Sequence, residues 1–143
     1  MADQASWERL QPFADRVIPR ALSPGLDGLT TKDQTLFLVW SFGAEVDNGG
    51  FGQFFFNSVG GYAVRTVEAL RRIGAESVAD LLTEAIGLFP RGAVPADIDE
   101  RNQVLSALPG DADEVFKELD ERFQEIGSDA VMDQLAHYYL QNA

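Results

Sequence analysis

The segment EVDNGGFGQFFFN, residues 45–57, combines two structural signals in one short stretch. Its aromatic residues Phe51, Phe54 and Phe55 have the i, i+3, i+4 spacing that places side chains on one face of an α-helix. The Gly49-Gly50 pair before them permits a sharp change of direction, because glycine has no Cβ to clash in left-handed conformations. The segment therefore predicts a turn and then a short helix over 51–57 whose phenylalanine face is buried.

The polar residues of the same segment are interpreted as structural. Asp47 or Asn48 is expected to cap the short helix, since such side chains accept hydrogen bonds from the first backbone N–H groups of a helix. Glu45, Gln53 and Asn57 are expected to form a polar corner beside the phenylalanine face. The residues assigned to this structural motif are Glu45, Asp47, Asn48, Gly49, Gly50, Phe51, Gln53, Phe54, Phe55 and Asn57.

Two known loop types fail to match this segment. A calcium-binding EF-hand loop that begins at Glu45 would need a bidentate Glu at its twelfth position, where the chain has Phe56. A dinucleotide-binding fingerprint would need a third glycine and a preceding strand, and the segment has neither. A small-ligand site, or a carboxylate-based enzyme site built on Glu45 and Asp47, stays an alternative at this corner.

Helical periodicity continues on both sides of the segment, and no convincing period-two alternation appears. Helices are expected over 6–22, 31–46, 51–57, 62–73, 77–89, 98–108, 111–126 and 128–141. Thr31 with Gln34, and Asp111 with Glu114, have the spacing of a capping box. The residues expected to face inward in the 62–89 hairpin are Val64, Val67, Leu70, Val78, Leu81, Leu82 and Ile86. We therefore predict an all-α fold, a single compact domain over residues 1–143 with about seven to eight helices.

The composition limits the possible function classes. The 143 residues include no Cys, which excludes disulfides and thiolate chemistry. The N-terminus lacks the basic and apolar regions of a secretory signal, and no stretch approaches the ~18 apolar residues of a membrane span, so a cytoplasmic location is expected. The formal net charge is −12, and residues 91–143, with 12 acids and 4 bases, contribute −8 of it. Such a surface repels nucleic acid and attracts basic partners.

The string EVDNGGFGQFFFNS resembles the DNA-mimic protein family, whose shared C-terminal-type domain was first defined as a domain of unknown function. The preceding LFLVWSFGAEV and the following VEALRRIGAESVADLL support the resemblance, which covers about residues 30–143. It implies an all-helical fold that is often dimeric. In one characterised member of the family, surface carboxylates stand in for DNA phosphates and bind the DNA-binding surface of a transcription factor, and the resemblance implies the same kind of activity here. The motif itself indicates only the fold. Mimicry depends on the surface charge, so the acidic residues are considered separately.

A row of acids follows the expected helix over 111–126. The acids recur at i, i+4, i+7 and i+11, and the last helix extends the row: Glu114, Glu118, Glu121, Glu125, Asp129 and Asp133. The apolar residues of the opposite face are Phe116, Leu119, Phe123 and Ile126. The row has the spacing to engage Lys or Arg side chains that normally bind phosphates. The alternative is an ordinary solvated face with Glu118–Arg122 and Asp113–Lys117 pairs.

Catalytic and metal-binding motifs are not evident. His137 is the only His, so no two-His metal site exists, and it is interpreted as a packed or dipole-facing side chain rather than a general base. No Gly-x-Ser-x-Gly nucleophile elbow is present. We expect no enzyme activity, no cofactor and no metal.

The sequence therefore predicts a binding module. Its expected partner is a basic protein such as a DNA-binding transcription regulator, with no direct contact to nucleic acid or membrane, and the family resemblance implies a homodimer. An inhibitory, immunity-type partner of a basic toxin or enzyme is the main alternative, because it would use the same charge complementarity.

Overall fold

The computed structural model describes residues 5–141 and contains no strand within them, which confirms the all-α prediction. The helices are α1 (Ser6–Arg20), α2 (Thr31–Phe56), α3 (Ala63–Arg72), α4 (Glu76–Ile86), α5 (Ile98–Ser106), α6 (Ala112–Ile126) and α7 (Ser128–Gln141). None of the helices in these residues combines the length and apolar character needed to cross a bilayer.

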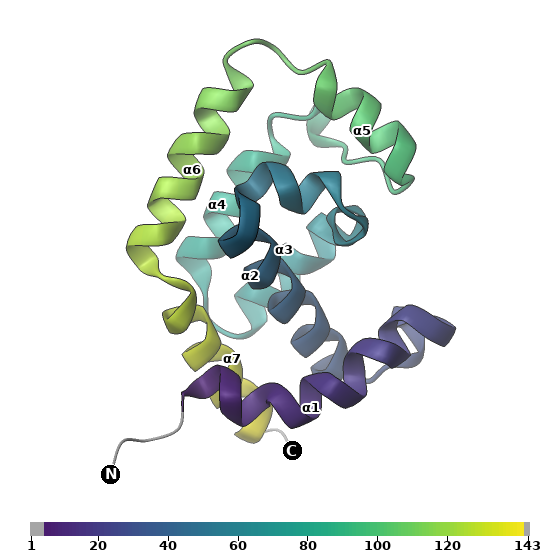
Figure 1. Ribbon diagram of the computed structural model, residues 1–143, viewed down its shortest axis with the longest axis vertical. Helices are drawn as coiled ribbons and strands as arrows, with labels where there is room; N and C mark the ends of the chain where they lie inside the picture. The colour runs from purple at the N-terminus through teal and green to yellow at the C-terminus, as the bar shows by residue number, and fades with distance from the viewer. Residues whose placement is uncertain (1–4, 142–143) are drawn as a thin grey trace.

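The longest helix, α2, lies at the centre of the fold (Figure 1). It contacts α1, α3, α5, α6 and α7, while α4 joins the assembly through α3 and α6. Its residues 35–39 are all buried, because neighbours cover more than one side of the helix. Figure 1 shows α6 along one edge of the molecule, and α7 passing beside the beginning of α1.

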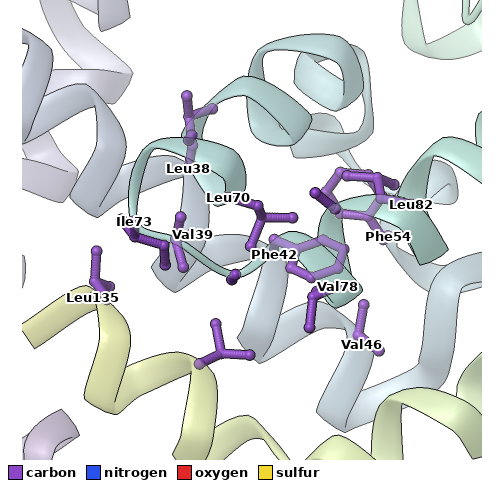
Figure 2. Packing of buried hydrophobic residues seen from close by; sticks show 14 of the residues in the cluster. Leu38, Val39, Phe42, Val46, Phe54, Leu70, Ile73, Val78, Leu82 and Leu135 are labelled. Carbon is purple, nitrogen blue, oxygen red and sulfur yellow. The ribbon is translucent and has the colours of Figure 1, made fainter. Parts of the chain in front are cut away.

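The core is built around Phe42 of α2. Its ring lies 5.2 Å from the ring of Phe54 and 5.9 Å from that of Phe123, both in edge-to-face geometry, and all three side chains are fully or almost fully buried. Figure 2 shows Phe42 and Phe54 together with Leu70 and Leu82 of the α3–α4 hairpin. Burial of each large apolar side chain contributes roughly 1.5–3 kcal/mol, so the aromatic cluster is a major source of stability.

The turn at Gly49-Gly50 bends one helical segment rather than separating two. The prediction ended the first helix near Val46, but α2 continues to Phe56 through a kink at the two glycines. Gly49 has φ −154° and Gly50 has φ 80° with ψ −175°, so neither is helical. Phe51, Phe54 and Phe55 are buried beyond the kink, as their spacing indicates.

Both predicted capping boxes are wrong. Thr30, not Thr31, caps α2, and its hydroxyl accepts a 3.3 Å hydrogen bond from the backbone N–H of Asp33. Gln34 donates instead to the carbonyl of Leu29. Asp111 precedes α6 with near-helical angles and makes no side-chain capping bond, so Glu114 has no capping-box partner. The spacing rule located the helix starts but not the hydrogen bonds that satisfy them.

Several helix limits differ from the prediction. The helix predicted over 77–89 begins at Glu76 and ends at Ile86, and a separate 3₁₀ turn follows at Pro90–Gly92. Val64, expected to face the core, is 55% exposed, whereas Leu70 is fully buried. The face of α3 that packs inward is therefore rotated away from Val64.

Candidate protein-binding surface

Four glutamates of α6 form a single row on the face opposite the core. We call Glu114, Glu118, Glu121 and Glu125 the α6 acidic row. At 100° per residue the row spans only about 60° of the helix circumference, and all four side chains are exposed. The opposite face buries Phe116, Leu119 and Phe123. Since α6 lies at the edge of the molecule (Figure 1), the row faces outward.

The bases of α6 do not form the ion pairs predicted from their spacing. Arg122, expected to pair with Glu118, reaches α4 instead, where its Nη1 lies 2.8 Å from Oε2 of Glu84. In the described part of the chain, no ion pair joins Lys117 to Asp113. The same ion pairs and hydrogen bonds include none of the four carboxylates of the row. The helix therefore presents these carboxylates to solvent without a partner of its own.

The two acids that were expected to extend the row lie beside a hollow next to α1. Asp129 and Asp133 are both exposed on α7, and Asp133 accepts a hydrogen bond from the hydroxyl of Ser6. The chain turns at Gly127, with φ 86°, between α6 and α7. Asp129 also lines a hollow of about 330 Å³, together with Trp7 of α1 and several residues of α2 and α7.

The polar corner of the 45–57 motif is a closed hydrogen-bond network. Oε2 of Glu45 accepts from Nε2 of Gln53 at 2.9 Å and from Nδ2 of Asn57 at 2.7 Å. Asn48 donates to Oε1 of Gln53 at 3.2 Å. These bonds join the two halves of α2 across its kink. The polar groups of the corner thus bind one another, which is the arrangement of a structural brace.

The residue that caps the second half of α2 is Asp120 of α6, not Asp47 or Asn48. Its carboxylate accepts a 2.7 Å hydrogen bond from the backbone N–H of Phe51. A Cβ at Gly50 would lie 2.3 Å from Oδ2 of Asp120, so only glycine leaves room for this contact. Burial raises the pKa of Asp120, although the Phe51 N–H opposes that shift.

Arg101 is a second structural residue that the sequence did not reveal. Its side chain is fully buried, and it donates hydrogen bonds only to backbone carbonyls. Nε and Nη2 donate to Phe55 and Asn57 at the end of α2, each at 2.7 Å, and Nη1 donates to Pro95 and Ala96. Burial lowers the pKa of Arg101, but arginine stays charged at neutral pH. The guanidinium therefore fastens α5 and the preceding loop to the end of α2.

The site residues do not assemble into a catalytic or metal-binding set. Asp47 is exposed on α2 and lines the hollow with Trp7, whereas Glu45 lies within the hydrogen-bonded corner. His137 is exposed in the second half of α7, so of its two interpretations the packed side chain is wrong and the dipole-facing side chain stays a prediction. Within residues 5–141, no three His, Cys, Asp or Glu side chains are placed to hold a metal ion.

Comparison with known proteins yields one match. Searches of curated proteins and of solved structures find none that is similar to this chain. The family model described as DMP19-like protein matches residues 27–142, which include the kinked helix α2, the polar corner and the α6 acidic row. The chain therefore belongs to the DMP19-like protein family, which is a family of DNA mimics and not of enzymes.

Proposed function

We propose that this protein is a DNA mimic that occupies the basic, DNA-binding surface of another protein through the α6 acidic row. The observation that carries the proposal is the row itself, with four exposed glutamates that have no ion-pair partner in the described structure. Membership of a DNA-mimic family supports a DNA-binding protein as the partner. Asp129 and Asp133 are proposed to continue the contact on α7.

The charge spacing of the row suits such a partner. From the first to the last of the four glutamates the helix rises about 16 Å at ~1.5 Å per residue. One charge therefore falls roughly every 5 Å, against one phosphate per ~3.4 Å along one DNA strand. Lys and Arg side chains are long and mobile, so a protein surface that contacts several phosphates can follow this spacing.

The remaining charges favour the same region. Residues 91–143 contain four bases, of which Arg101 is buried and Arg122 is paired with Glu84. Few basic side chains are therefore left at the surface of this region to neutralise its 12 acids. Such a field accelerates encounter with a basic partner and opposes direct binding to DNA or RNA.

The alternative functions make different demands. An inhibitor of a basic toxin or enzyme would use the same row, so only the identity of the partner separates it from a DNA mimic. An enzyme or ligand site at the 45–57 corner is not favoured, because Glu45, Gln53 and Asn57 already bind one another.

The test is affinity capture of the partner from the native cell, followed by binding measurements with a charge variant. Changing all four row residues, Glu114, Glu118, Glu121 and Glu125, to Gln removes four charges and keeps side-chain length. We expect the variant to bind the captured partner at least tenfold more weakly, which corresponds to about 1.4 kcal/mol. Its affinity should also depend less on salt, because fewer charges are screened. The wild-type protein should compete with DNA for the partner.

A matched control separates local charge from total charge. The variant Glu8→Gln, Glu68→Gln, Asp99→Asn and Glu100→Gln also removes four exposed charges, on α1, α3 and α5. It should bind the partner almost as tightly as wild type. Equal losses in the two variants would mean that only net charge matters, and an unchanged affinity of the row variant would remove α6 from the interface.

A further inference from the structure

The most distinctive surface feature outside the α6 acidic row is a groove between α1, α2 and α7. Two adjoining hollows of about 330 and 280 Å³ share Trp7, Asp129 and Met132. We call the combined feature the tryptophan groove and define it by Trp7, Trp40, Asp47, Asp129 and Met132. Each of the two hollows is close in size to the lower end for small-molecule sites, ~300 Å³, so each suits a single side chain rather than a large ligand.

The groove exists because of the residue order on one face of α2. Trp40, Gly43, Ala44 and Asp47 follow the i, i+3, i+4, i+7 spacing and so lie on one side of the helix. The two small residues leave a hollow floor between the indole and the carboxylate. A Cβ at Gly43 would lie 3.4 Å from Cε of Met132, which is an ordinary van der Waals contact, so α7 passes close to this side of α2.

Besides α2 and α7, the groove is bounded by the beginning of α1, which is held in place by its packing on α7. Leu10 and Ala14 are fully buried there, and the rings of Phe13 and Tyr139 lie 5.1 Å apart. Trp7, at the start of α1, nevertheless remains 47% exposed. The indole is therefore presented at the groove by a fixed helix, which lowers the entropy lost when a ligand packs on it.

The groove carries one sign of charge. Asp47 and Asp129 line it, Asp133 lies at its end, and its lining contains no Lys, Arg or His. The chain covers other aromatic rings with its own cations, as with Lys32, whose Nζ lies 4.3 Å from the ring centre of Tyr139. Among residues 5–141 no such contact involves Trp7 or Trp40. Two indole rings and two carboxylates are thus left without a cation.

We infer that the tryptophan groove binds one arginine side chain of the basic partner. A guanidinium group stacks on indole faces and forms paired hydrogen bonds with carboxylates, so one arginine satisfies both features of the groove. A lysine ammonium lacks the planar shape for stacking, and anionic ligands are repelled by the aspartates. This inference rests on the proposed function for the basic character of the partner. It adds an aromatic anchor that the α6 acidic row lacks.

Intrinsic fluorescence tests the groove directly, because Trp7 and Trp40 are the only tryptophans of the chain and both line it. The full chain is titrated with the peptide acetyl-Gly-Gly-Arg-Gly-Gly-amide. The matched peptides carry Lys, or the uncharged isostere citrulline, in place of Arg. We expect a saturable change with the Arg peptide, a several-fold weaker response with Lys and none with citrulline. Equal responses to Arg and Lys, or to Arg and citrulline, would overturn the assignment of an arginine site.

Variants locate the binding site. Asp47→Asn and Asp129→Asn should each weaken binding of the Arg peptide about fivefold, the ratio expected for loss of one exposed charge pair. Asp99→Asn on α5 is the control and should leave the titration unchanged. Circular dichroism and chemical denaturation of each variant establish that it is folded. Unchanged affinity in both groove variants, or no saturable change with the wild-type chain, would exclude the groove.

The two proposals fail in different ways. If the α6 row variant loses the captured partner while the peptide titration shows nothing, the proposed function stands and the arginine site is overturned. If the titration succeeds and the row variant keeps the partner, the groove is supported and the role of α6 is overturned. The double variant Asp47→Asn, Asp129→Asn should also weaken the captured partner several-fold with the α6 row intact.

Discussion

At the residue scale, two charged side chains, the fully buried Arg101 and the partly buried Asp120, hold segments that are distant in sequence. Arg101 joins α5 and its preceding loop to the end of α2 through four carbonyl groups. Asp120 joins α6 to α2 through the N–H of Phe51. Both side chains satisfy backbone groups that a helix terminus or a kink leaves without a partner, and buried backbone groups without a partner are costly.

Removing the hydrogen-bond donors of Arg101 should strongly destabilise the fold. In Arg101→Met, several buried carbonyls lose their donors, each at a cost of about 1–3 kcal/mol, so we expect the free energy of unfolding to fall by about 3 kcal/mol or more. Arg101→Lys should retain only part of the lost stability, because an ammonium group cannot reach both the carbonyls at the end of α2 and those of the loop before α5. Urea denaturation measures the change, with the exposed Arg9→Met as control. A loss below about 1 kcal/mol in Arg101→Met would contradict a bracing role.

Asp120 should make stability depend on pH in an unusual direction. Its pKa in the folded chain is raised above the ordinary 3.8, chiefly by burial. The folded state therefore holds its proton more tightly than the unfolded state, and this contribution to stability is lost as the pH rises from about 4 through the raised pKa. Asp120→Asn keeps an acceptor for the N–H of Phe51 but cannot ionise. Urea denaturation between about pH 4 and 7 should show the Asn variant gaining stability relative to wild type. A constant difference would contradict the raised pKa.

At the element scale, the kink divides α2 into a long segment and a short one with different tasks. The long segment contributes Phe42 to the core and Asp47 to the tryptophan groove. The short segment turns Phe51 and Phe54 back against the same core. Gly50 permits this turn because its φ of 80° with ψ −175° belongs to a region that is open almost only to glycine.

Two glycines of the same segment allow a matched test of the kink. Gly50→Ala should lower the free energy of unfolding by about 1–3 kcal/mol through backbone strain alone. The new Cβ should also displace the carboxylate of Asp120 and add to this loss. Gly52→Ala lies in helical backbone with nothing within 4 Å of the new Cβ, so we expect no loss and a gain of up to about 1 kcal/mol. Thermal and urea denaturation compare the two variants. Equal effects would show that the kink does not depend on Gly50.

At the scale of the whole molecule, a formal charge of −12 surrounds one hydrophobic core. The core includes residues from Leu10 in α1 to Tyr139 in α7, so the helices at both ends of the described chain pack into it. Within residues 5–141 only a few acids form ion pairs, such as Glu76 and Asp80 with Arg71. Self-repulsion among surface acids therefore opposes the compact state.

This repulsion predicts a salt effect on stability. Between about 0.1 M and 1 M KCl the Debye length falls from ~10 Å to ~3 Å, so the free energy of unfolding of the wild-type protein should rise. The four-Gln variant of the α6 acidic row has a formal charge of −8 and should gain less from salt. Its stability at 0.1 M should lie within about 0.5 kcal/mol of wild type or above it, since exposed substitutions change little. An equal or larger salt effect in the variant would contradict repulsion at the row.

The sequence alone was sufficient to predict the helices, the buried phenylalanine face and the row of four glutamates. Each depends on side-chain periodicity within one helix, and that periodicity is local. The acids of α6 fell on one exposed face because Phe116 and Phe123 bind the other face to the core. The family was recognised from the 45–57 motif for a related reason, since the turn and its aromatic face lie within one short segment.

Tertiary packing decided which distant groups meet. Asp120 caps a helix 69 positions away, and Arg122 pairs with Glu84 of α4 rather than with its neighbour Glu118. Arg101 looks like any surface arginine of a polar helix until the end of α2 is placed beside it. The tryptophan groove likewise requires α1, α2 and α7 to converge. Helical spacing limits which side chains share a face, but only the packed core determines which faces come together.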